Sequence, residues 1–351
     1  MKKRLIPFAA IIILLLAGSA VDAYNTHGRW SGDSATMRAS SVGFPAGDAY
    51  RTALGTVASR FNQNPSEFRF TQRYDDASVS LDNDQNEVWF SADPDFDPAW
   101  TYWWYDIWGD IVEADVVFYN GEDYTTSMSK TSLWSYGGTR RPFQTTALHE
   151  YGHAAGLEHE ADEYNLMGSD WTHISCNGAT ARSYVGEDAS DGLVHLYTGR
   201  DGVAIENVGV TLFRRTGFSG EYSTHGHCKI TNSLGTELAY TTYSGQRRYA
   251  VDKGQRVRVW FTYENSGETT QTVNVGYYIS PNATISTADT LFDTRRFTMR
   301  RNNVDTRYVS LKIPVDLVSG TTYWLGAIVD YDNALTEIDE YNAAYHIIRV
   351  N

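Results

Sequence analysis

The stretch His149-Glu150-Tyr151-Gly152-His153-Ala154-Ala155-Gly156-Leu157-Glu158-His159 decides how this part of the chain folds and what it binds. Residues 143–155 have the pattern of a helix that Gly156 ends. Two histidines four positions apart on a helix differ in direction by about 40° and in height by one turn, so both rings can reach one ion. Because glycine tolerates positive φ, the chain can turn back after Gly156 and bring His159 to the same ion. The stretch therefore predicts a three-histidine metal site.

Glu150 lies directly beside the first of these histidines in the sequence. On a helix it points about 100° away from His149, which places its carboxylate next to the ion rather than on it. Three protein ligands leave the fourth position of a zinc ion open for water, the arrangement of catalytic zinc sites. Bound zinc lowers the pKa of that water towards about 7, and a neighbouring carboxylate can take the proton. We therefore predict zinc-dependent hydrolysis with Glu150 as the general base.

A methionine follows the third histidine in the segment Asn165-Leu166-Met167-Gly168. With it, the whole pattern resembles the signature of the metzincin zinc endopeptidases. The short separation of His159 and Met167 is similar to that of the matrixin group and its bacterial relatives. Residues 111–118 and 190–197 resemble that group's strand before the active-site helix and its closing helix, so the resemblance covers about residues 28–198.

The resemblance implies a role for each residue of the motif. His149, His153 and His159 would bind the zinc, and Glu150 would act as the base and then as proton donor to the leaving amine. Met167 would form a hydrophobic floor beneath the zinc without binding it. The second, structural zinc of vertebrate matrixins needs histidines between positions 27 and 149, where this chain has none, so one zinc is expected. Gly168-Ser169-Asp170-Trp171 replaces the usual Met-Tyr-Pro continuation, so the group's cleavage specificity does not carry over.

The first residues have the pattern of an export signal. Lys2, Lys3 and Arg4 precede the apolar residues 5–17, and Val21-Asp22-Ala23 offers small residues for a signal peptidase. The alternative is a membrane-anchoring helix, for which the apolar run is short. We predict a signal peptide over residues 1–23, no membrane span after its cleavage, and a secreted protein at an extracellular, periplasmic or cell-surface location.

Two domains are predicted after the signal peptide. Helical patterns over residues 48–62, 143–155 and 188–197 mix with strand patterns, which indicates an α+β catalytic domain over residues 24–199, with a mixed sheet and an active-site helix. Beyond it, alternating residues such as Val257, Val259, Phe261 and Tyr263 indicate only strands, as in an immunoglobulin-like β-sandwich over residues 200–351.

The second domain also resembles a known module. Its segments 263–267, 320–330 and 337–342 are similar to the bacterial adhesion-related immunoglobulin-like domain called CARDB. The resemblance implies an accessory domain that binds a surface or a protein, although fold alone does not establish this.

Composition narrows the functional classes. The chain has 351 residues, 42% of them hydrophobic, and a net charge of −14. This length favours two domains, and the apolar content excludes a disordered chain. An acidic chain repels phosphate backbones, so we expect no nucleic-acid partner. Cys176 and Cys228 are the only cysteines, and in an oxidising compartment they are a candidate disulfide; the alternative is two unrelated thiols.

Two further groups of residues allow more than one interpretation. The acidic residues suit a calcium ion or simply a solvated loop, and they are Asp82, Asp84, Asn86 and Glu87, followed by Asp93, Asp95 and Asp97. The aromatic run at 100–108 favours packing over a sugar- or peptide-binding platform. The histidines outside the motif are interpreted as structural or surface residues, with His225 and His227 as a weaker metal-binding alternative.

The function predicted from the sequence is a secreted zinc endopeptidase that acts on proteins or peptides. One alternative is a surface-binding or adhesion protein whose protease module is inactive. Against it, the motif retains all three histidines and Glu150. A second alternative is a zinc hydrolase that acts on a non-peptide amide.

Overall fold

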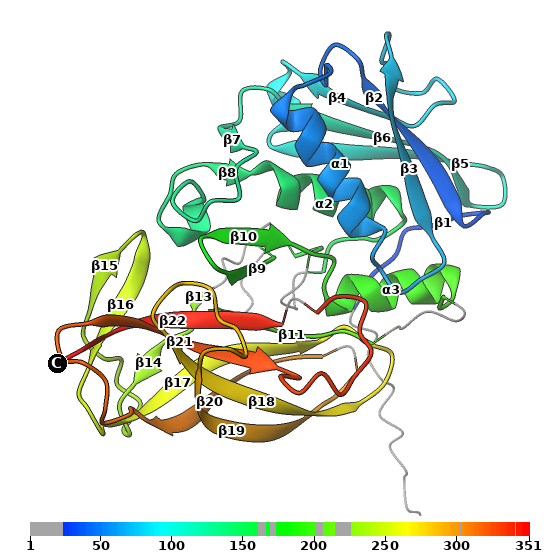
Figure 1. The fold of residues 1–351 in the computed structure, drawn as a ribbon. Helices are drawn as coiled ribbons and strands as arrows, with labels where there is room; N and C mark the ends of the chain where they lie inside the picture. Colours follow the sequence, from blue (N-terminus) through cyan, green and yellow to red (C-terminus); the bar gives the residue numbers. More distant parts are fainter. Residues whose placement is uncertain are drawn as a thin grey trace, which may run out of the picture.

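The computed structural model describes residues 24–160, 166–168, 173–200, 206–214, 226–301, 303–340 and 342–351. The predicted signal peptide, residues 1–23, lies outside these ranges. No helix within them is long and apolar enough to cross a membrane. Figure 1 shows an N-terminal part, in which helices lie against a sheet, above a C-terminal part made of strands.

The N-terminal part is built on a mainly parallel sheet. Its strands run in the order β1-β6-β4-β2-β3, and β5 pairs with β6 in the antiparallel direction. The sheet strands are β1 (Arg29–Trp30), β2 (Ser34–Ser40), β3 (Arg69–Asp76), β4 (Glu87–Ser91), β5 (Ala99–Tyr105) and β6 (Asp110–Tyr119). The sheet is mixed, as predicted, and its parallel majority makes this part of the chain α/β. Parallel neighbours need a crossover, which α1 (Ala49–Phe61) supplies between β2 and β3.

Helix α1 begins and packs as its sequence pattern predicts. The Asp48 carboxylate caps it by accepting a hydrogen bond from the Tyr50 backbone N–H at 2.7 Å. Its buried face carries Ala53, Leu54, Val57, Ala58 and Phe61. Helix α1 packs against α2 (Phe143–Ala154), and both helices also contact the sheet, α1 at β3 and α2 at β5 and β6. Helix α3 (Glu187–Tyr197) completes the part.

The remaining elements of this part are short. They are 3-10 helices at Pro94–Phe96 and Trp134–Tyr136, and strands β7 (Tyr124–Thr125), β8 (Arg141–Pro142), β9 (Ile174–Asn177) and β10 (Thr180–Ser183). Strands β9 and β10 form an antiparallel hairpin that lies on the side facing the C-terminal part (Figure 1).

The described C-terminal residues form a sandwich-like pair of sheets. The smaller sheet contains β11 (Val208–Thr211), β14 (Ile230–Thr231), β17 (Arg256–Asn265) and β20 (Asn303–Lys312). The larger sheet contains β15 (Tyr240–Tyr243), β16 (Gln246–Val251), β18 (Gln271–Ser280), β19 (Thr290–Met299), β21 (Thr322–Val329) and β22 (Ala343–Val350). The short strands β12 (Phe213–Arg214) and β13 (Gly226–His227) pair with each other. The alternation along β17 buries Val257, Val259, Phe261 and Tyr263 in the core, as the strand pattern predicts.

The two parts share a hydrophobic core. Leu133, Tyr136, Ile174 and Ala181, which precede α3, belong to the cluster that fills the C-terminal sandwich. The Asn177 side chain also exchanges hydrogen bonds of 2.7 and 2.9 Å with the backbone of Ile285. The predicted domain boundary at 199/200 falls between α3 and β11, yet side chains from before it help to fill the second core.

Candidate metal centre

Three histidine rings meet at one point beside α2. His149, His153 and His159 bring their Nε2 atoms to 3.1 Å from one another in every pair. Among the residues that the structure describes, they are the only group of three histidine, cysteine, aspartate or glutamate side chains whose ligand atoms lie within 4.8 Å of one another. Ligands about 2.0–2.1 Å from a tetrahedral zinc ion lie about 3.3–3.4 Å apart. The triad therefore fits a small divalent cation such as zinc.

The hydrogen bonds behind the rings leave the correct nitrogen available for a metal. Nδ1 of His149 donates to the Leu166 carbonyl oxygen at 2.7 Å, and Nδ1 of His153 donates to the Leu157 carbonyl oxygen at 2.7 Å. A donating Nδ1–H leaves the lone pair on Nε2 in a neutral imidazole. Carbonyl acceptors behind metal-binding histidines fix ring orientation in this way.

The surroundings of the rings also favour the neutral form that binds metal. Burial, followed by the nearby His159 ring, lowers the pKa of His149 to about 3. Burial and the two neighbouring rings lower the pKa of His153 well below its usual value. Neutral imidazoles are the ligands that zinc requires, so both rings are ready to bind without losing a proton.

The third ligand depends on a turn at Gly156. This glycine has φ +102°, and a Cβ atom placed on it would lie 2.2 Å from the Gly28 carbonyl oxygen. The turn runs beside the N-terminal segment, where the His27 N–H donates to the Gly156 carbonyl at 3.0 Å and the Glu158 N–H donates to the Asn25 carbonyl at 2.8 Å. The Asn25 side chain donates to the His159 carbonyl at 3.2 Å. Residues 25–28 therefore hold the loop that carries His159.

Glu150 is buried next to the triad, with 1% of its surface exposed. The Thr101 hydroxyl donates to its carboxylate at 2.5 Å and also to its backbone carbonyl at 3.2 Å. Burial raises the pKa of Glu150 to about 8, and the Thr101 hydrogen bond partly opposes that shift. Thr101 was not identified from the sequence, although strand alternation within the aromatic run sets it on the same side as Trp103, towards α2.

Met167 packs against the histidine helix at Gly152, and its role as a floor residue stays a prediction of the resemblance. It is 1% exposed, and a Cβ atom placed on Gly152 would lie 2.3 Å from its sulfur. Only glycine at position 152 therefore allows this approach. The neighbouring Leu166 carbonyl accepts a hydrogen bond from His149. The segment 166–167 therefore contacts both the histidine ring and the helix that carries it.

A cleft of about 220 Å³ runs between β5 and the triad. On the strand side it is lined by Asp97, Trp100, Thr101 and Trp103, and on the other side by Glu150, His153, Glu158 and His159. Apart from Glu150 and the two histidines, none of these residues was assigned to the site from the sequence. The cleft brings the general-base candidate and two of the three metal-ligand candidates to one solvent-reachable surface.

The aromatic run is divided between packing and exposure. Trp103 stacks on His27 with ring centroids 4.0 Å apart, and the His27 Nε2 donates to the His153 carbonyl at 2.9 Å. On the opposite face of β5, Trp100, Tyr102 and Trp104 follow one another at 6.2 and 6.3 Å. Trp100 is 52% exposed and Trp108 82% exposed. Packing therefore explains Trp103 but not Trp100 or Trp108.

The acidic residues predicted as calcium ligands are not gathered into a comparable group. The Asp82 and Asp84 side chains are exposed, whereas Glu87 is buried in the sheet beside Asp115. Asp93 caps the Pro94–Phe96 turn by accepting the Asp95 N–H at 3.0 Å. Calcium binding stays a prediction of the sequence.

Of the two cysteines of the candidate disulfide, the structure describes the side chain of Cys228 but not that of Cys176. Cys228 is buried, with its sulfur 3.7 Å from the Thr262 hydroxyl, and its N–H donates to the Leu212 carbonyl at 2.6 Å. The backbone of Cys176 lies in β9, but its side chain is outside the described residues. His225 lies outside them as well, and His227 is half-buried beside Phe213. The disulfide therefore stays a prediction.

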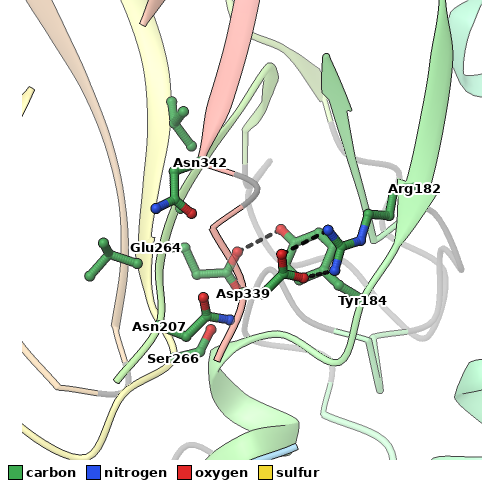
Figure 2. Close-up of a pocket in the computed structure, with 10 residues that line it drawn as sticks. Arg182, Tyr184, Asn207, Glu264, Ser266, Asp339 and Asn342 are labelled. Carbon is green, nitrogen blue, oxygen red and sulfur yellow. Dashed lines mark hydrogen bonds and ion pairs between the residues drawn. The ribbon is translucent and has the colours of Figure 1, made fainter. Parts of the chain in front are cut away.

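A second, smaller pocket lies between the two parts of the chain (Figure 2). Arg182 of β10 forms an ion pair with Asp339, with one N–H···O distance of 2.8 Å. Tyr184 donates to the Glu264 carboxylate at 2.6 Å, and the Glu187 N–H donates to the same carboxylate at 2.8 Å. These charged and polar contacts connect the C-terminal part to the segment between the Met167 turn and α3.

Comparison with known proteins gives similarities to solved structures but no family. No family model matches the chain, and no curated protein matches it. About 44% of the chain is similar in structure to 95% of the CARDB domain of the PF1109 protein from Pyrococcus furiosus, a domain solved with di-metal ions, at 14% identity and a TM-score of 0.25. A solution structure of the same domain is similar over 42% of this chain and 97% of its own, at 15% identity and a TM-score of 0.25. The Pseudomonas fluorescens DNA glycosylase AlkC is similar over 42% of this chain and 31% of its own, at 12% identity and a TM-score of 0.22.

Proposed function

We propose that this chain is a secreted, zinc-dependent endopeptidase of the metzincin type. The observation that carries the proposal is the meeting of three Nε2 atoms, 3.1 Å apart in each pair, beside the buried carboxylate of Glu150 in an open cleft. His149, His153 and His159 would hold the zinc. When bound, zinc polarises the scissile carbonyl and makes a water molecule acidic enough to be deprotonated near neutral pH.

The chain's own residues supply the remaining chemistry. The Glu150 carboxylate accepts the proton of the attacking water and then transfers it to the leaving amine. The Thr101 hydroxyl holds that carboxylate at 2.5 Å and so fixes its direction. Strand β5 pairs only with β6 among the described strands. Its other edge therefore offers backbone N–H and C=O groups to an extended peptide lying in the cleft.

The C-terminal sandwich would act as an accessory domain that positions the enzyme at a surface or a protein partner. Its support is the CARDB resemblance of its sequence. Its shared core with the N-terminal part places it against the catalytic part rather than at the end of a flexible linker. Secretion follows from the export-signal pattern of residues 1–23.

The proposal is tested by metal analysis together with peptide turnover. The purified secreted protein should contain one zinc per chain and give a casein or gelatin zymogram that a chelator abolishes. Glu150→Ala should keep the zinc and lose about two to four orders of magnitude in turnover, because Glu150 neighbours the ligands without being one. Glu340→Ala, which changes an exposed glutamate far along the chain, is the matched control. Near-normal turnover in Glu150→Ala would refute the assigned role.

The same experiment separates the rival functions. Zinc binding without hydrolysis of any protein would favour a binding protein with an inactive protease module. Hydrolysis of simple amides but not of peptides would favour a different zinc hydrolase.

A further inference from the structure

The cleft beside the triad carries negative charge at both ends. Asp97 and Glu158 line it, and no lysine or arginine does. From this arrangement we infer that the cleft selects peptides with lysine or arginine on both sides of the bond that is cleaved. The inference rests on the proposed peptidase function and assigns its substrate class.

Asp97 stands at the entrance to β5. It ends the Pro94–Phe96 turn, directly before the strand begins at Ala99, and its side chain is exposed. Trp100, three residues further on, borders the same cleft, but its ring lies with Tyr102 and Trp104 on the other face of β5. The exposed Asp97 carboxylate suits a long cationic side chain, since ammonium and guanidinium groups pair with carboxylates.

Glu158 stands at the other end of the strand. Burial, followed by the charge of Glu158, raises the pKa of Tyr105, the last residue of β5. The backbone of Glu158 is fixed by its hydrogen bond to the Asn25 carbonyl at 2.8 Å. Its half-buried side chain faces the cleft from the loop that carries His159. The two carboxylates therefore bracket the triad along the direction in which a peptide would lie.

Both carboxylates are available to a ligand. Within the described residues, the lysine and arginine side chains that form ion pairs do so with other acids, and none pairs with Asp97 or Glu158. Arg141, whose charge bears on His149, is itself paired with Glu122 at 3.2 Å. A cationic side chain of the substrate would thus meet uncompensated charge at either end.

The centre of the cleft, unlike its ends, is not expected to favour a cationic side chain. A divalent cation held by three neutral histidines repels a cationic side chain placed directly over it. The preference is therefore expected at the residues flanking the scissile bond on each side. Because Asp97 is exposed and Glu158 half-buried, we expect a combined advantage of about tenfold in kcat/KM rather than an absolute requirement.

The test uses the full zinc-loaded chain and three series of fluorogenic peptides. The series are identical except that the flanking residues are Lys or Arg, Gln or Leu, or Glu. We expect the basic series to have kcat/KM about tenfold above the neutral series and the acidic series to fall below it. Raising the salt concentration should reduce the advantage, because exposed charges are screened. An advantage of the Leu peptides would instead indicate that Trp100 and Trp103 select an apolar side chain, and would overturn the inference.

Two variants locate the effect. Asp97→Asn and Glu158→Gln should each remove the basic preference on one side of the scissile bond, and on opposite sides from each other. Asp95→Asn, an exposed acid two residues from Asp97 that does not line the cleft, is the matched control and should keep both preferences. Zinc content and thermal unfolding confirm that each variant folds.

The possible failures are distinguishable. Equal turnover of all three series, or a preference that persists in Asp97→Asn and Glu158→Gln, overturns the substrate class and leaves the peptidase standing. No cleavage of any series by the zinc-loaded chain overturns the proposed function, and the inference with it.

Discussion

At the scale of single residues, the site depends on groups that do not themselves bind metal. The carbonyl oxygens of Leu166 and Leu157 set the tautomers of His149 and His153, and the Thr101 hydroxyl holds Glu150. Each of these contacts joins residues on different elements. The orientation of the histidines and of Glu150 is therefore set by Leu157 within the motif and by Thr101 and Leu166 outside it.

Thr101 is expected to be a positioning residue. Thr101→Val removes the hydroxyl but keeps the shape, so the Glu150 carboxylate loses its orienting hydrogen bond. We expect kcat to fall by about tenfold or more with zinc content unchanged. Steady-state kinetics with metal analysis measures this. Thr101→Ser, which restores a hydroxyl, should recover most of the rate, and equal losses in both variants would point to packing instead.

A buried carboxyl pair in the sheet predicts a pH-dependent stability. Burial, then the charges of Glu113 and Glu87, raises the pKa of Asp115 to about 8, and burial with the nearby Asp76 raises that of Glu87 to about 7. Both carboxyl groups therefore hold their protons to a higher pH in the folded state than in the unfolded chain. Their contribution is complete below the ordinary carboxyl pKa of about 4 and is lost as pH rises through 7–8.

We therefore expect the free energy of unfolding to fall between about pH 4 and 8, by about 1.4 kcal/mol per pH unit for each group that is protonated only in the folded state. Asp115→Asn, which cannot ionise, should flatten this dependence. Chemical denaturation across the pH range measures it, with Asp95→Asn as the exposed control. A wild-type profile as flat as that of Asp115→Asn would contradict the assignment.

At the scale of elements, the turn after α2 places the His159 ring beside those of His149 and His153. Gly156 has φ +102° and lies against the Gly28 carbonyl. Hydrogen bonds between the N-terminal segment 25–28 and the loop 156–159 hold the two segments in a fixed relative position.

Gly156→Ala should damage the site without touching a ligand. An alanine at this φ costs about 1–3 kcal/mol in strain, and its Cβ would lie 2.2 Å from the Gly28 oxygen. We expect a lower Tm and a zinc affinity at least about tenfold weaker, measured by competition with a chelator. Gly32→Ala, where a Cβ meets nothing within 4 Å, is the control. Unchanged zinc affinity would show that the loop tolerates a shifted turn.

At the scale of the whole molecule, the C-terminal sandwich shares a hydrophobic core with the part of the chain that carries the three histidines. Ile174 and Ala181 of the β9–β10 hairpin enter its core, and Arg182 pairs with Asp339. The hairpin lies between the Met167 turn and α3 in the chain, so the sandwich contacts the segment that supports the metal centre (Figure 1).

The Cys176–Cys228 disulfide belongs to this scale, because it would join the hairpin to the sandwich. Strand β9, which carries Cys176, contacts β11, and the Cys228 N–H donates to the Leu212 carbonyl just after β11. We expect a closed bond in the secreted protein, worth about 4 kcal/mol before strain. Mass spectrometry of unreduced protein decides this, and Cys176→Ser with Cys228→Ser should lower Tm. Two thiols in the active secreted form would remove the bond.

Helix and strand periodicity accounts for the local features of this protein. The four-residue spacing of His149 and His153, the glycine after the helix and the alternation along residues 257–263 are set by helix and strand periodicity, so they could be predicted without tertiary information. Which distant residues surround the three histidines depends on the tertiary structure. Thr101 and the Leu166 carbonyl meet α2 through sheet pairing and loop packing, and the Ile174 and Ala181 side chains fill a core on the far side of the predicted boundary. Such contacts join segments tens of residues apart, and local periodicity carries no information about them.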